Sequence, residues 1–169
     1  MWDLRLTGRG IDLEAELLLP YWPGKAIIRK GAGSVLLADL AGPGIGGLLA
    51  VSALDGAISD LFGTPTPTAT LSAEARGIAI DGTALGAGPV DGALRGTGEW
   101  QANLALTGGV SPVQGRISGA LPGLAGLIEV TIAEVSALPA ATRQTLSAIG
   151  VAEAGGLRLS LPLALWLWR

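Results

Sequence analysis

Apolar and polar residues alternate with a period of two along most of this 169-residue chain. Near its start, Leu4 and Leu6 lie between Asp3, Arg5 and Thr7. Successive side chains of a strand point to opposite faces of a sheet, so this alternation is typical of a β-strand with one packed face and one solvated face. The pattern therefore predicts a mainly β fold.

Turn signals that contain glycine separate the alternating runs at intervals of about ten residues. Asp81-Gly82 and Gly108-Gly109 are strong examples, because a type I′ turn requires positive φ at both central residues. We therefore interpret the 27 glycines as hairpin punctuation, which predicts an antiparallel meander of about nine to eleven strands. The runs expected as strands are residues 2–7, 11–17, 26–29, 34–39, 71–76, 78–80, 90–94, 100–107, 113–119, 128–132 and 157–168.

Two segments depart from the period of two and predict short helices. Between residues 45 and 62, apolar residues recur at helical spacing, and Gly63 follows as a stop. A second helix is expected between Ser136 as its cap and Gly150 as its stop, with Pro139 near its first turn. The apolar residues of this second helix are Leu138, Leu146 and Ile149.

The length of the chain suits one domain over residues 1–169, since a chain of this size buries about 70% of its unfolded surface on folding. We expect a curved antiparallel meander sheet or β-roll, with the two short helices covering one end or face. An open sheet has edge strands, and these can pair with another chain.

The chain contains no cysteine and no histidine. This excludes thiol nucleophiles, Ser-His-Asp relays, disulfides and the common zinc and haem sites. Among carboxylates, Glu14 and Glu16 lie on the solvated face of one run, while Asp81 and Asp91 each precede glycine, as aspartate often does in turns. The glycine-rich residues 42–47 lack the Lys-Ser/Thr of a phosphate-binding loop. We therefore expect no catalytic, cofactor-binding or metal-binding residue and no enzymatic activity. If the chain were an enzyme, the alternative left by its composition would be a glycan-acting enzyme that uses carboxylates.

Eleven Lys and Arg residues against fourteen Asp and Glu residues give a net charge of −3. The cations are scattered and form no stripe that would neutralise successive phosphates, which argues against nucleic acid as a partner. Lys25, Arg29 and Lys30 form one local cluster, which is either a solvated strand end or a contact with anionic lipid.

No uncharged stretch is long and apolar enough for a membrane-spanning helix, which takes about 20 residues. Met1 is followed directly by an alternating run, without the regions of a signal peptide. Two interpretations fit: a cytoplasmic protein, or a domain whose anchor or signal lies upstream of Met1.

The last alternating run, residues 157–168, differs from the others because both of its faces become apolar from Leu161 onward. A strand enclosed between the sheet and a helix would have this composition. The alternative is that its tryptophans face an acyl chain, a partner or a membrane surface. Trp22 is expected in a turn with a surface contact, whereas Trp2 and Trp100 are expected in the core. The candidate lipid- or partner-facing residues are Trp22, Leu161, Leu163, Leu165, Trp166 and Trp168.

Short strand-and-turn segments with a common character are spread over nearly the whole chain. They are residues 77–82 (GIAIDG), 85–89 (LGAGP), 98–109 (GEWQANLALTGG), 115–119 (GRISG), 138–139 (LP) and 155–161 (GGLRLSL). In these segments the chain resembles the protein N family of the bacterial type II secretion system. None of them is a catalytic motif.

The resemblance implies a curved antiparallel sheet on the periplasmic face of the bacterial inner membrane, similar to the groove proteins related to AsmA, with a single anchoring helix upstream of Met1. It implies a non-enzymatic accessory component of the secretion machinery that acts by contact with other type II secretion or envelope proteins. The family offers no catalytic residues to carry over. The alternative function is a lipid-binding or lipid-shuttling groove, in which an apolar face of the sheet holds acyl chains.

Overall fold

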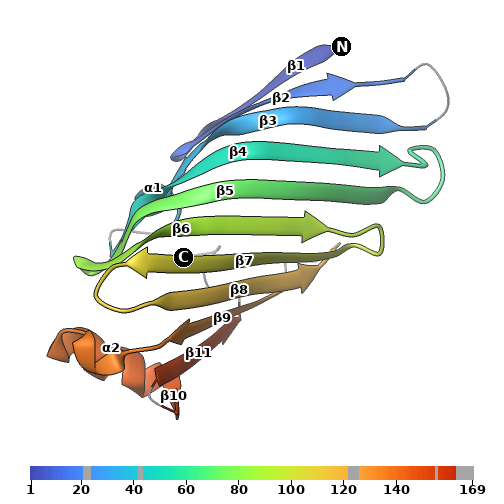
Figure 1. The fold of residues 1–169 in the computed structure, drawn as a ribbon. Helices are drawn as coiled ribbons and strands as arrows, with labels where there is room; N and C mark the ends of the chain where they lie inside the picture. Colours follow the sequence, from blue (N-terminus) through green and yellow to red (C-terminus); the bar gives the residue numbers. More distant parts are fainter. Residues whose placement is uncertain (21–23, 42–43, 122–125, 155, 163–169) are drawn as a thin grey trace.

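The alternating runs pair with their neighbours in the sequence and form one open antiparallel sheet of eleven strands, in the order β1-β2-β3-β4-β5-β6-β7-β8-β9-β11-β10 (Figure 1). The computed structural model describes residues 1–20, 24–41, 44–121, 126–154 and 156–162. The strands are β1 Trp2–Gly8, β2 Ile11–Leu18, β3 Ala26–Leu36, β4 Ile45–Ser59, β5 Thr66–Ile80, β6 Thr83–Leu94, β7 Glu99–Gly108, β8 Val113–Ala120, β9 Gly126–Ile132, β10 Gly150–Glu153 and β11 Gly156–Pro162.

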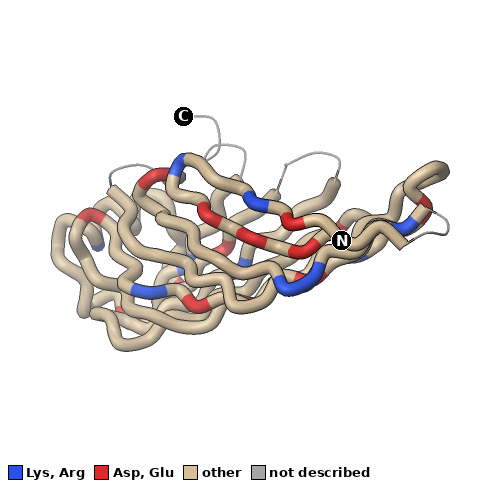
Figure 2. Tube along the Cα trace, turned by 90° about the horizontal axis from the view of Figure 1, so that it is seen from above, with Lys and Arg blue, Asp and Glu red and all other residues tan. Residues whose placement is uncertain are grey.

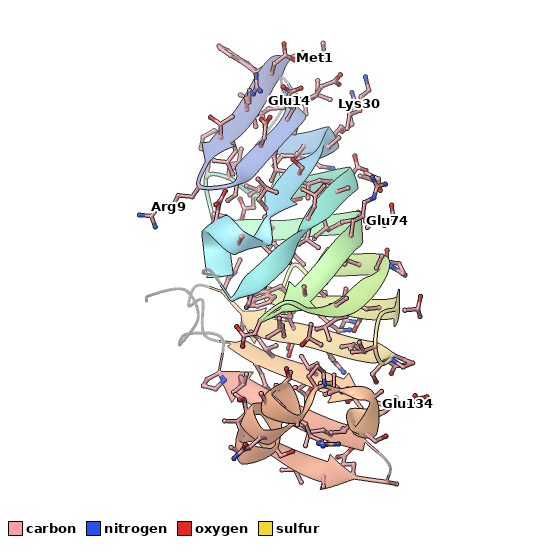
Figure 3. All side chains as sticks on the ribbon, turned by 90° about the vertical axis from the view of Figure 1, so that its left-hand side faces the viewer. Met1, Arg9, Glu14, Lys30, Glu74 and Glu134 are labelled. Atoms are coloured by element: carbon pink, nitrogen blue, oxygen red, sulfur yellow. The ribbon has the colours of Figure 1, made fainter. Side chains whose placement is uncertain are left out.

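Two short α-helices accompany the sheet. Helix α1 (Leu37–Ala41) connects β3 to β4, and α2 (Ala140–Ile149) follows a 3₁₀ turn (Val135–Ala137) between β9 and β10. Figure 3 shows α1 beside the first half of the sheet and α2 at its far end. The expected fold class, a mainly β antiparallel meander with two short helices, is confirmed.

The helix expected over residues 45–62 is wrong, because this segment is the 15-residue strand β4. Leu49, Val51 and Leu54 face the same side of the sheet, although Val51 and Leu54 are three residues apart. This spacing comes from a bulge at Ser52, where β4 has one residue more than β5. The bulge shifts the alternation by one residue and so imitates helical spacing. The three glycines of the segment also disfavour a helix interior.

The two strands expected over residues 26–29 and 34–39 are a single strand, β3, which continues through the glycines between them. A bulge at Lys30, whose φ is 54°, keeps β3 paired with both β2 and β4. After Leu36 the chain enters α1, so the second expected strand ends earlier than its pattern indicates.

The second expected helix is confirmed as α2, with corrected ends. Its N-cap is Pro139, while Ser136 lies in the preceding 3₁₀ turn and caps nothing. Leu138 and Leu146 are buried as expected, but the Ile149 side chain is 53% exposed.

The two faces of the sheet differ sharply in composition. We call the face that carries Leu13, Val51, Val90, Leu104 and Leu159 the apolar face, and the opposite one the polar face. The buried core lies on the apolar face, mainly over β5 to β11 and under α2. Charged positions are few, and acidic and basic ones are interspersed (Figure 2).

Candidate functional site

Residues that lie opposite one another in neighbouring strands form rows that cross the apolar face. The central row contains only apolar residues and glycine, and it has a member in every strand of the sheet. With ten spacings of about 4.8 Å between strands, this row runs about 48 Å along the sheet. Its members, from β1 to β10, are Leu6, Leu13, Gly33, Val51, Ala73, Val90, Leu104, Gly115, Val130, Leu159 and Gly150.

A second row is covered by the helices. Leu106 and Ile132, which belong to this row, are 1% and 2% exposed. Leu146 of α2 and Leu37 of α1 pack into the same core, and the hydroxyl oxygens of Thr83 and Thr142 lie 3.1 Å apart, tying α2 to β6. The last members of this row are Leu106, Val113, Ile132, Leu157 and Ala152 in β7, β8, β9, β11 and β10; the first four are buried, and Ala152 is exposed on the edge strand.

Two more apolar rows lie on the other side of the central row. The first contains Gly31, Leu54, Leu71, Gly92, Ala102, Ile117, Ile128 and Leu161. The second contains Trp2, Leu17, Ile28, Gly56, Ala69, Leu94, Trp100, Gly119 and Gly126. Their large side chains are half-buried or exposed in the structure, so this part of the apolar face remains accessible.

A hollow of about 190 Å³ opens where the accessible rows meet the covered one. Nearly all of the side chains around it are aliphatic. They include Leu37, Leu49, Val90, Leu104, Ile117 and Val130. The hollow has the size and chemistry to take an apolar group rather than a hydrated one.

The polar face is held by surface hydrogen bonds between neighbouring strands. Arg116 donates to Gln101 Oε1 at 2.7 Å, and Ser72 donates to Asp91 Oδ1 at 3.2 Å. Arg158 donates to Glu129, and this hydrogen bond, with the charges of Glu129 and Glu153, raises the pKa of the Arg158 guanidinium. These groups are exposed or half-buried and satisfy one another.

Carboxylates and the basic cluster have structural roles. Glu14 is exposed on the polar face as expected, where it and Asp12 pair with Arg5 at 3.4 and 3.2 Å. The hydrogen bond from Arg5 to Asp12, followed by the charges of Asp12 and Glu14, raises the pKa of Arg5. Lys30 donates to Glu16 at 2.8 Å and is solvated, but it lies at the bulge inside β3, so the expectation of a strand end is wrong for this residue.

Two carboxylates that precede glycine, Asp81 and Asp91, were expected in turns. Asp81 lies in the expected two-residue turn, with φ of 47°, but Asp91 lies inside β6 and makes no turn. Within the part of the chain that the structure describes, no three Asp or Glu side chains converge on a position that would hold a metal ion.

One of the six expected contact residues falls within the described residues. Leu161 is half-buried on β11, at the end of the row that contains Leu54 and Leu71. The remaining five, Trp22, Leu163, Leu165, Trp166 and Trp168, lie outside the described residues.

The two tryptophans that were expected in the core differ in their burial. Trp100 is half-buried on the apolar face, but Trp2 is 65% exposed on the edge strand β1. The prediction is wrong for Trp2 because no further described strand covers that edge. The sequence showed which residues of each strand are apolar and share a face. It did not show how these residues line up across strands into rows, because that depends on the register of ten strand pairs.

No protein-family model, curated protein or solved structure matches this chain. Among the described residues, no helix is long and apolar enough to cross a membrane. The apolar face is therefore the feature of this structure that bears on function.

Proposed function

We propose that the apolar face binds the acyl chains of lipids, and that the protein is a non-enzymatic lipid-holding or lipid-passing component on the periplasmic side of the bacterial inner membrane. The observation that carries this proposal is the central row, which crosses all eleven strands without a polar side chain. Val51, Ala73, Val90 and Leu159 of this row are buried in the core, but the two rows beside it are half-buried or exposed. An accessible apolar surface of this length marks a site for an apolar ligand or partner.

The spacing of the rows suits a hydrocarbon chain. Neighbouring rows on one face are two residues apart along each strand, which is about 7 Å. An acyl chain can lie in the furrow between two rows, perpendicular to the strands, and each buried methylene contributes about 0.8 kcal/mol. Gly33 and Gly115 lower the floor of the central row, because they place no side chain there.

The experiment is native mass spectrometry of protein purified without detergent, followed by lipid extraction. Leu104 is half-buried beside the hollow, whereas Ala105, its neighbour in β7, is exposed on the polar face. Leu104→Gln and Ala105→Gln therefore place the same amide on opposite faces. We expect phospholipid to co-purify with the parent protein and with Ala105→Gln, and its occupancy to fall at least about fivefold with Leu104→Gln, since an amide desolvated without a partner is costly.

An unliganded mass for the parent protein would contradict the proposal. Equal lipid occupancy in the two variants would contradict it as well. Circular dichroism and the melting temperature of both variants serve to separate a loss of binding from a loss of folding.

A role in type II secretion through protein contacts is the second proposal, and one observation favours it. Phe62 lies 89% exposed in the turn between β4 and β5. The turn itself is well held, because Leu61 donates its amide to Gly24 O at 2.7 Å and Thr64 donates its amide to Asp60 Oδ2 at 2.9 Å. A rigid turn that presents an aromatic side chain is a typical contact anchor.

A photo-reactive amino acid in place of Phe62 tests this second proposal in cells that carry a type II secretion system. Cross-links to secretion components, absent when the probe replaces Ala105, would support it. Cross-links to none of them would refute this contact.

A further inference from the structure

Strand β1 is an unprotected edge of the sheet. All seven of its residues are exposed, and no described element lies beyond it (Figure 1). It contains no proline, lysine or bulge, which are among the usual devices that prevent edge pairing, and its two charged residues, Asp3 and Arg5, have opposite signs. The opposite edge, β10, is only four residues long and has α2 packed against it. The two edges therefore differ in their capacity to accept another strand.

The turn between β1 and β2 fixes which backbone groups of β1 point outward. Arg9 and Gly10 have φ of 42° and 75°, as in a type I′ turn, which makes Gly8 and Ile11 the hydrogen-bonded closing pair. Hydrogen-bonded pairs recur every second residue, so Leu4 and Leu6 bond to β2. Asp3, Arg5 and Thr7 direct their N–H and C=O groups away from the sheet.

We propose that β1 pairs with β1 of a second copy of this chain, antiparallel and centred on Leu4. This register places Asp3 of each copy opposite Arg5 of the other, so that the outward backbone groups of both residues are paired and their charges are opposite. On the apolar face it places Leu4 opposite Leu4, and Trp2 opposite Leu6.

Other two-fold registers of β1 are less favourable. A centre at Arg5 puts two guanidinium groups opposite each other, and a centre at Asp3 does the same with two carboxylates. A centre at Leu6 leaves Trp2 against the turn of the other copy. The charges of β1 and the position of its turn together select one register.

Two features of the free edge, the charge of Asp3 and the exposure of Trp2 and Leu6, also favour pairing in this register. Asp3 lies opposite Glu16 of β2, a like charge, and takes part in no ion pair among the described residues. The pairing places Arg5 of the second copy, which also contacts Asp12 and Glu14 of its own chain, opposite Asp3 as a cation. Trp2 and Leu6, which are 65% and 60% exposed, cover each other across the junction. The apolar rows then continue from one copy into the next. The proposal does not depend on lipid binding, because edge pairing needs only the backbone and side chains of β1.

Single-cysteine variants test the register, since the chain has no cysteine of its own. In the proposed pair the two Leu4 residues form a non-hydrogen-bonded pair with Cα atoms about 4.5 Å apart, within the range that a disulfide spans. The two Leu6 residues are four positions apart along the strand, about 13 Å, which no disulfide bridges. We expect mild oxidation to convert Leu4→Cys into a covalent dimer and to leave Leu6→Cys uncross-linked. A mixture of Trp2→Cys with Leu6→Cys is expected to yield the mixed disulfide.

Asp3→Pro tests the role of the edge itself. This substitution removes an outward amide and leaves the hydrogen bonds between β1 and β2 intact, which is the position where an edge strand tolerates proline. In sedimentation velocity we expect the parent protein to show a concentration-dependent dimer, and Asp3→Pro to raise its dissociation constant at least about tenfold. The circular dichroism spectrum is expected to remain unchanged.

Three results would overturn the proposal. They are a parent protein that stays monomeric at all soluble concentrations, cross-linking of Leu6→Cys as fast as that of Leu4→Cys, and a dimer that Asp3→Pro leaves intact. The first would point to a strand of a different protein as the occupant of this edge.

Discussion

At the scale of single residues, some glycines are required by the close approach of neighbouring strands. A Cβ atom on Gly88 of β6 would overlap the carbonyl oxygen of Ala105 in β7. Gly46 of β4 differs, because a Cβ there would lie 4.0 Å from the Cβ of Ala79, an ordinary contact. Glycine is thus necessary at one position and replaceable at the other.

We expect Gly88→Ala to lower the free energy of unfolding by about 1–3 kcal/mol, because the strands must separate to admit the methyl group. Gly46→Ala is expected to change it by less than about 0.5 kcal/mol, since it meets only ordinary contacts. Urea denaturation followed by tryptophan fluorescence measures both. Similar losses in the two variants would mean that β6 and β7 are not held as closely as the structure indicates.

At the scale of elements, α2 is attached through one side only. Leu146 is 8% exposed and packs into the core with Leu157 and Leu159, while Ile149, three residues later, is 53% exposed. The helix has no side-chain cap at its N-terminus. Its stability therefore comes from packing on the sheet more than from its own sequence.

Leu146→Ala is expected to reduce the free energy of unfolding by about 2–4 kcal/mol, through lost burial and the cavity left behind. Ile149→Ala is the matched control on the same helix, and we expect it to cost less than about 0.5 kcal/mol. Chemical denaturation of the two variants gives the comparison. A larger loss with Ile149→Ala would place the packed side of α2 elsewhere.

The elements also show how far the sequence determines this fold. Alternation and the Asp81-Gly82 turn were sufficient to predict the antiparallel meander, because both are local signals. The strand β4 was missed because a bulge at Ser52 interrupts its alternation of apolar and polar residues. A bulge is defined by the pairing with the partner strand, so the sequence of β4 alone does not reveal it. The accessible apolar face was not predictable in detail for the same reason: its rows depend on register, which combines bulges and turns over the whole sheet. Leu161 was identified from composition, and its place in a row comes from the pairing of β11 with β9.

At the scale of the whole molecule, each strand contacts chiefly its two neighbours, so the sheet resembles a repeat array in which stability can vary along its length. Strands β1 and β2 contain no buried residue. Strands β5 to β9 and β11 contain the most enclosed side chains of the sheet, among them Ala75, Leu106, Val113 and Ile132. The edge-pairing proposal uses the less buried end of this gradient, whereas the hollow of the lipid proposal lies over the better-buried strands β4 to β9.

We expect the gradient to appear in amide hydrogen exchange. In Asp3→Pro, which is designed to be monomeric, the amides of Leu4 and Leu13 are expected to exchange at least about tenfold faster than those of Leu106 and Val113, because opening the first hairpin exposes little apolar surface. In the parent protein, pairing with a second copy is expected to slow exchange at Leu4 in proportion to the dimer population and to leave Leu106 unaffected. Equal protection of all four amides in Asp3→Pro would mean that the eleven strands open as one cooperative unit, and the apolar face could then admit a ligand only by binding on its surface, without local opening of the sheet.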